Sequence, residues 1–119
     1  EDLRGLETRI PIGADESLQH IGEFPHIAEI YDVVNIKLDK CGGLTEALQI
    51  VRLCQEHNKR LMVGCMVGTS YSMAPAFIVA QHCEFVDIDG PLLLAEDVAG
   101  GMEYGPTGIV QAPEVGFWG

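Results

Sequence analysis

The sequence predicts an α/β protein built from parallel strand–helix units. Its four predicted strands are continuous apolar runs, which is typical of strands covered by helices or closed into a barrel. They recur about every 23 to 28 residues with helices between them, the spacing of parallel units joined by right-handed crossovers. No GxGxxG or GxxxxGKS/T motif opens a helix, so a nucleotide-binding sheet has little support. A doubly wound sheet and a (β/α)8 barrel both fit this pattern.

The first half of the chain contains two predicted strands and two helices. Residues 10–14 form a short apolar strand, and Pro25 suits the first turn of the short helix that follows. Residues 33–38 form the second strand, and the turn Gly42-Gly43 comes after it. The next helix is amphipathic and is expected to stop at Asn58; its apolar face comprises Leu44, Ala47, Leu48, Val51 and Cys54.

The second half continues this order up to residue 90. Residues 61–63 and 85–88 are predicted strands, with a helix over 73–82 between them. Residues 61–80 are uncharged and as long as a membrane span, but glycines, serines and Pro75 interrupt them, which favours a strand, a turn and a helix. After Gly90-Pro91 the chain becomes a glycine-rich tail, interpreted as an irregular return segment.

The composition argues against several classes of protein. Among 119 residues, 18 acidic side chains outnumber 7 basic ones, and the net charge of −11 opposes binding to nucleic acids or anionic membranes. With 47% apolar and 21% charged residues, the chain is globular. The cysteines lack CxxC spacing and are expected to be buried, reduced thiols. No leader is recognisable at the start, so we expect a cytoplasmic protein.

Charged residues stand at three of the four predicted strand ends. Asp15 ends the first strand, Lys37 lies near the end of the second, and Asp87 and Asp89 end the fourth. In parallel α/β proteins these C-terminal ends carry the chemistry. Lys37 has apolar neighbours on both sides, and burying a lysine requires acidic partners. We therefore expect these groups to converge on one site.

The residue types at this site suit proton abstraction next to a carboxylate. Carboxylate oxygens can hold Mg²⁺, which can stabilise the charge of an enolate. A lysine near a cation is pushed towards its neutral form and can act as a base. Asp87 and Asp89, two residues apart on a strand, point to the same side.

The strand ends resemble the enolase superfamily over residues 14–17, 35–47, 63–69 and 87–91. They are most similar to the dipeptide epimerases of the L-Ala-D/L-Glu type, in the muconate-lactonizing subgroup. The resemblance implies a (β/α)7β barrel with a capping domain, in which residues 1–95 supply strands five to eight and residues 96–119 pack on the cap. It also implies an isomerase with a Mg²⁺ cofactor, a small dipeptide substrate and a homo-oligomeric complete enzyme.

The resemblance assigns one catalytic residue, one metal ligand and one neighbour of that ligand. Lys37 matches the acid/base lysine on the sixth strand, Asp15 matches one metal-ligand carboxylate, and Glu16 matches a neighbour that supports this ligand. The family's other lysines and its other two metal ligands would lie upstream of Glu1. We therefore expect the isolated chain to be inactive, and a non-catalytic fragment stays an alternative.

The resemblance also assigns the substrate contacts. Cys65 matches a position that lines the substrate pocket, and Asp87 and Asp89 match the pair that binds the dipeptide ammonium. An N-acylamino acid racemase, a cycloisomerase and an o-succinylbenzoate synthase are alternatives on the same scaffold. The acidic pair counts against them, because their substrates carry no ammonium at that place. The roles of Asp39 and Lys40 stay open.

Overall fold

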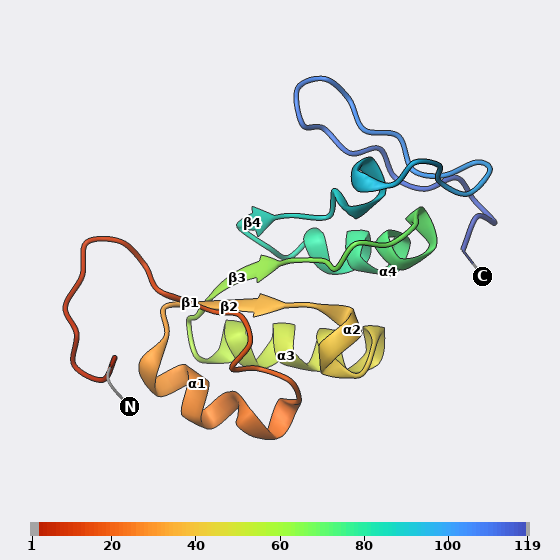
Figure 1. Ribbon diagram of the computed structural model, residues 1–119. Helices are drawn as coiled ribbons and strands as arrows, with labels where there is room; N and C mark the ends of the chain where they lie inside the picture. The colour runs from red at the N-terminus through yellow and green to blue at the C-terminus, as the bar shows by residue number, and fades with distance from the viewer. Residues whose placement is uncertain (1–2, 119) are drawn as a thin grey trace.

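A computed structural model describes residues 3–118 of the chain. Its centre is a parallel sheet with the strand order β1-β2-β3-β4 (Figure 1). The strands are β1 (Gly13–Ala14), β2 (Val33–Ile36), β3 (Arg60–Val63) and β4 (Phe85–Val86). The helices are η1 (Ile21–Glu23), α1 (Phe24–Ile30), α2 (Leu38–Cys41), α3 (Leu44–Glu56), α4 (Ser70–Ala80) and η2 (Gly90–Leu93).

The strand order shows that the sheet winds in one direction, as a barrel does. Each strand pairs in parallel with the next one along the chain. Right-handed crossovers that all advance the same way place their helices on one face of the sheet. Accordingly, α1 packs against α3, and α3 packs against α4 (Figure 1). A doubly wound sheet would reverse its order at a switch point. The described residues therefore form part of a βα barrel, as the resemblance implies.

The hydrophobic core lies between the sheet and these helices. Ile36 on β2 and Val63 on β3 are fully buried, in one cluster with Ile50 and Cys54 of α3. Of the apolar positions predicted for α3, Ala47, Val51 and Cys54 are buried in this core and Leu44 packs against it. Leu48 is only partly buried and lines a surface hollow instead. Asn58 adopts a left-handed φ of 53° just beyond the helix, so the predicted stop is confirmed.

Some element bounds differ from the predicted ones. The first strand covers Gly13–Ala14 only, and β4 ends at Val86. β2 ends at Ile36 because Lys37 already caps α2, a single helical turn that was not predicted. α4 begins at Ser70, earlier than residue 73, because Asp97 Oδ1 accepts a hydrogen bond from the Ser70 N–H at 2.9 Å. This cap comes from a distant part of the chain.

The sheet face opposite the helices is open within residues 3–118. A hollow of about 460 Å³ lies on it, lined by Ile10, Pro11, Gly13, Val33, Arg60, Met62 and Phe85. The two outer strands, β1 and β4, each pair on one side only. A sheet that winds in one direction, with one apolar face uncovered and two unpaired edges, needs further strands to close.

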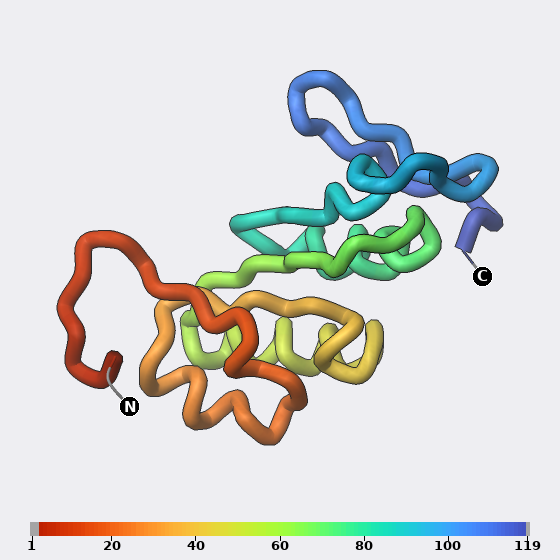
Figure 2. The backbone as a smooth tube through the Cα atoms, viewed as in Figure 1, coloured from red at the N-terminus to blue at the C-terminus, as the bar shows by residue number. Residues whose placement is uncertain are grey.

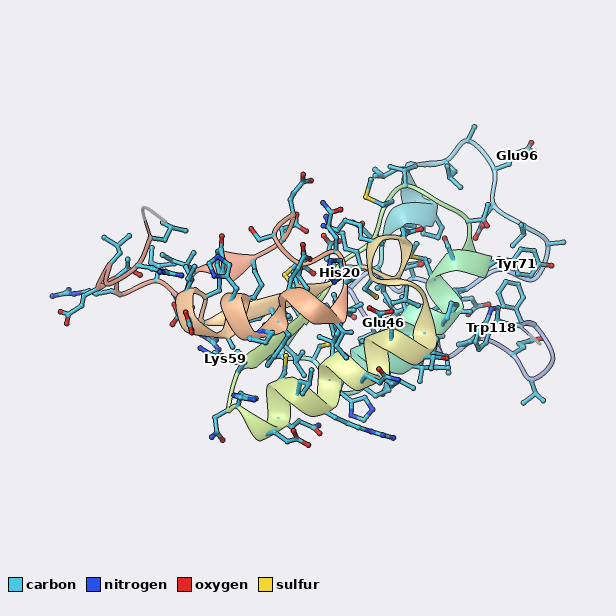
Figure 3. The ribbon with its side chains drawn as sticks, turned by 90° about the horizontal axis from the view of Figure 1, so that it is seen from below. His20, Glu46, Lys59, Tyr71, Glu96 and Trp118 are labelled. Atoms are coloured by element: carbon cyan, nitrogen blue, oxygen red, sulfur yellow. The ribbon has the colours of Figure 1, made fainter. Side chains whose placement is uncertain are left out.

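The C-terminal segment, residues 94–118, is irregular and lies beside α4. The N-terminal segment, in red, and the C-terminal segment, in blue, lie at opposite ends of the described structure (Figure 2). Tyr71 of α4 stacks on Phe117 with ring centroids 4.9 Å apart. Figure 3 shows Tyr71 and Trp118 at the C-terminal end of the molecule. Across the residues described, no helix has both the length and the apolar character needed to cross a membrane.

Candidate active site

The predicted site residues lie at one edge of the sheet, beyond the C-terminal ends of its strands. Because the four strands are parallel, the loops that follow them meet at this edge. The side chains form two groups. The first, here called the lysine–aspartate cluster, comprises Asp15, Asn35, Lys37 and Lys40. The second, here called the acidic trio, comprises Cys65, Asp87 and Asp89.

The lysine–aspartate cluster joins the first two loops. Lys37 Nζ donates to Asp15 Oδ2 at 3.0 Å, and Lys40 Nζ donates to Asp15 Oδ1 at 3.0 Å. The Lys37 side chain is only 16% exposed, so the expectation that it needs an acidic partner is confirmed. Partial burial raises the pKa of Asp15, but the hydrogen bonds from Lys37 and Lys40 outweigh it and hold the pKa below its ordinary value.

The single turn of α2 brings Lys40 back towards Asp15. The Lys37 carbonyl accepts hydrogen bonds from the N–H groups of Lys40 at 3.0 Å and Cys41 at 3.1 Å, which closes the turn. Lys40 Nζ also donates to the Asp15 carbonyl at 2.9 Å. Gly42 ends the turn with a φ of 95°, a conformation that favours glycine. Lys40 therefore holds both the backbone and the carboxylate of Asp15.

Asn35 belongs to the same cluster, although it was not predicted as a site residue from the sequence. Its Nδ2 donates to Asp15 Oδ1 at 3.1 Å, whereas its buried Oδ1 has no hydrogen-bond partner among the described residues. A Cβ atom at Gly64 of the neighbouring loop would lie 2.9 Å from Asn35 Oδ1 and 3.0 Å from Lys37 Cε. One feature of the sequence could have predicted Asn35. It is a polar residue in an apolar strand, two positions before Lys37, and therefore lies on the same face of the strand as Lys37.

The acidic trio joins the loops after β3 and β4. One ligand atom from each of Cys65, Asp87 and Asp89 lies within 4.8 Å of the others. Partial burial and the neighbouring Asp89 raise the pKa of Asp87. Burial, together with the two carboxylates, raises the pKa of the Cys65 thiol. Negative charge is thus concentrated at this point, which favours a cationic ligand.

Two acidic residues stand apart from both groups. Glu16 is exposed, and no described residue donates a hydrogen bond to its carboxylate. Its supporting role stays a prediction. Asp39 is exposed in the first turn of α2 and likewise has no described side-chain partner. Of the two residues whose roles were open, only Lys40 contacts the site.

The donor chemistry of the cluster fits a hard divalent cation. Asp15 offers two carboxylate oxygens, and Asn35, whose Nδ2 donates to Asp15, has an Oδ1 without a hydrogen-bond partner among the described residues. Mg²⁺ prefers oxygen ligands and is usually held by one or two carboxylates with water and substrate oxygens. One carboxylate supplies only part of the ligands that Mg²⁺ requires, so further ligands must come from other groups.

The fold and the position of these groups define a βα-barrel protein with its site at the C-terminal strand ends. Residues 1–116 match the family described as Enolase C-terminal domain-like, and the chain belongs to this family. The four strands and their order agree with the barrel expected for it.

Several proteins are similar to the chain. An N-acetyl-D-glutamate racemase from Pseudoalteromonas sp. is 45% identical over 97 residues, which are 82% of this chain and 31% of the racemase. An enolase family member from Agrobacterium tumefaciens with homology to dipeptide epimerases, crystallised with sodium and L-Ala-L-Glu, is 45% identical. It aligns with a TM-score of 0.93 over 99% of this chain and 36% of that one.

A dipeptide epimerase from Methylococcus capsulatus, crystallised with Mg and L-Arg-D-Lys, is 35% identical. Its TM-score is 0.83, over 94% of this chain and 34% of that one. The chain therefore spans about a third of the length of the relatives it matches.

Proposed function

We propose that this chain forms the C-terminal part of a Mg²⁺-dependent dipeptide epimerase, an isomerase that inverts an α-carbon by moving a proton. The observation that carries the proposal is that the lysine–aspartate cluster and the acidic trio lie at the same edge of the sheet. The similar Methylococcus capsulatus epimerase, crystallised with Mg and a dipeptide, supports the cofactor and the substrate class.

Lys37 acts as the base on one face of the substrate. In its neutral form the Lys37 amine takes the α-proton of the C-terminal residue and becomes an ammonium, leaving an enolate. A second lysine, from outside the described residues, returns a proton to the opposite face. Asp15 would be one ligand of the Mg²⁺ ion, with the Asn35 amide beside it. When bound, this ion stabilises negative charge on the substrate carboxylate.

The acidic trio binds the free ammonium of the dipeptide. The two carboxylates and the thiol beside them offer several hydrogen-bond acceptors to an ammonium group. A hydrogen bond to a charged group contributes roughly 1.5 to 3 kcal/mol. Binding the ammonium there also offsets the burial and the repulsion by Asp89, which together raise the pKa of Asp87.

A second candidate is an N-acylamino acid racemase. The similar Pseudoalteromonas racemase, at 45% identity, favours it. An N-acylated amino acid has no ammonium to pair with Asp87 and Asp89, so this substrate would leave the trio's charges uncompensated. The acidic trio therefore favours the dipeptide.

The test compares a free dipeptide with its N-acetylated form in the full-length enzyme. We expect a higher kcat/KM for the free dipeptide. Asp89→Asn should lower this value about ten- to a hundredfold and should change the acetylated substrate much less. Equal loss on both substrates would show that Asp89 is structural, and better turnover of the acetylated substrate would favour the racemase.

We further propose that residues 96–119 pack on a capping domain and that the complete enzyme is a cytoplasmic homo-oligomer. Ile109 is 65% exposed and Val115 is fully exposed, which supports a covering partner for this segment. Four free cysteines support a reducing compartment. Exposed Leu92 and Leu93 support a contact between subunits.

A further inference from the structure

The C-terminal segment holds the backbone that carries the acidic pair. Sheet pairing of this strand continues as far as the Asp87 N–H, which donates to the Val63 carbonyl at 2.9 Å. One residue further on, the Ile88 carbonyl accepts a hydrogen bond from the Tyr104 hydroxyl at 2.8 Å. Tyr104 is partly buried against the core. Tyr104 thus supplies a hydrogen bond to the backbone just beyond the last residue that is paired in the sheet.

The position of this hydrogen bond matters because of peptide geometry. The Ile88 carbonyl and the Asp89 N–H belong to one rigid peptide plane. The Ile88 side chain is 2% exposed and is anchored in the core. The hydrogen bond to the Ile88 carbonyl fixes the orientation of this peptide plane, and with it the orientation of the Asp89 backbone.

Tyr104 itself is held in place by its own segment. It forms an antiparallel bridge with Val110, and the Gly105 N–H donates to the Ile109 carbonyl at 2.8 Å. Upstream, the Met102 N–H donates to the hydroxyl of buried Ser70 at 2.8 Å. The segment is therefore tied to the start of α4 before it reaches Tyr104.

A close approach between loops places Cys65 beside the acidic pair. A Cβ atom at Gly90 would lie 2.7 Å from the Met66 carbonyl, so the loops after β3 and β4 touch there. Tyr104 also lines a cavity of about 300 Å³ with Asp87 and Asp89. Tyr104 therefore forms part of the same cavity wall as the two carboxylates.

We infer that Tyr104 is a positioning residue, which orients Asp87 and Asp89 so that the acidic trio accepts a primary ammonium group. The ammonium ligand rests on the proposed function, whereas the effect of Tyr104 on the backbone does not. The hydroxyl acts through the Ile88 carbonyl and does not touch the substrate.

The test uses Tyr104→Phe in the full-length enzyme, with Tyr71→Phe as the matched control on an exposed, stacked tyrosine. Losing one hydrogen bond should raise KM for a free dipeptide about fivefold and change kcat less than about twofold. The N-acetylated dipeptide should be nearly unaffected. An unchanged KM, or equal loss on both substrates, would overturn the inference.

A second measurement does not depend on turnover. The two carboxylates help to raise the pKa of the Cys65 thiol, so a displaced pair should speed alkylation of Cys65 by iodoacetamide in Tyr104→Phe. Buried Cys54 is the internal reference. An unchanged Cys65 rate would overturn the role of Tyr104. Absence of dipeptide turnover in the unmodified enzyme would instead overturn the proposed function.

Discussion

Lys37 and Asp15 face each other across neighbouring loops, with Nζ 3.0 Å from Oδ2. The other carboxylate oxygen, Oδ1, accepts hydrogen bonds from Lys40 at 3.0 Å and Asn35 at 3.1 Å. Asp15 is therefore oriented by groups other than the proposed base. This division allows Lys37 to move towards a substrate while Lys40 and Asn35 keep the carboxylate in place.

Replacing Asp15 by Asn should remove a pH-dependent part of the stability. The pKa of Asp15 lies below its ordinary value of 3.8, so the carboxylate stabilises the fold above that pH, and the contribution is lost as the pH falls through the lowered pKa. At neutral pH we expect a loss of roughly 0.5 to 1 kcal/mol, because the half-exposed pair is screened.

Urea unfolding of the full-length protein between pH 7 and pH 3 measures this effect. The difference between Asp15→Asn and the unmodified protein should shrink as the pH falls. Glu96→Gln, on an exposed residue, is the control. A difference independent of pH would mean that the ion pairs of Asp15 do not stabilise the fold.

Adding a methyl group at Gly64 should disturb the base with little effect on the fold. The added Cβ would come within 3.0 Å of Lys37 Cε and 2.9 Å of Asn35 Oδ1, so one of these side chains must shift. Misplacement of a reacting group by about 1 Å can lower the rate about a hundredfold. We expect Gly64→Ala to lower kcat at least tenfold, with a melting temperature close to normal.

Gly13→Ala is the matched control for Gly64→Ala. The φ of Gly13 is not positive, and its added Cβ would meet only ordinary contacts at 3.8 Å and beyond. Gly100→Ala would not serve, because Gly100 has a positive φ. Similar kcat values for Gly64→Ala and the unmodified enzyme would show that Lys37 does not need this space.

Asp87→Asn should stabilise the protein at neutral pH although it damages the site. The pKa of Asp87 is raised by partial burial and by Asp89, so the folded state holds its proton more tightly than the unfolded chain. Stability therefore declines as the pH rises above the ordinary value of 3.8, until the raised pKa is passed. The amide carries no charge and avoids this decline.

Thermal unfolding against pH tests this prediction. The Asp87→Asn variant should melt above the unmodified protein at pH 7, and the two should converge below about pH 4. A lower melting temperature for the variant at pH 7 would mean that the carboxylate stabilises the fold in spite of its burial and its repulsion by Asp89.

Much of the fold and part of the site could be predicted from local pattern. Apolar runs located the four strands, helical spacing located α3, and the cost of burying Lys37 predicted its acidic partner. Local pattern alone could not predict the strand order, because apolar runs do not record whether successive crossovers advance in one direction. Only the family resemblance pointed to a barrel.

Contacts that depend on irregular backbone were also missed. Asp97 caps α4 from 27 residues away, and Tyr104 reaches Ile88 across 16 residues. Both depend on the path of a glycine-rich tail that has no periodicity. Asn35 differs, since its position two residues before Lys37 already placed it on the face of the base.

The role of Lys37 as the base is tested most directly by epimerisation of a free dipeptide in deuterated water, comparing Lys37→Met with Lys40→Met in the full-length enzyme. Removing a general base should lower epimerisation, followed by α-proton exchange, about 10²- to 10⁴-fold in Lys37→Met while the fold persists. Lys40→Met should lose much less, because Lys40 only orients Asp15. Comparable losses in the two variants, or normal exchange in Lys37→Met, would contradict the assignment of Lys37 as the base.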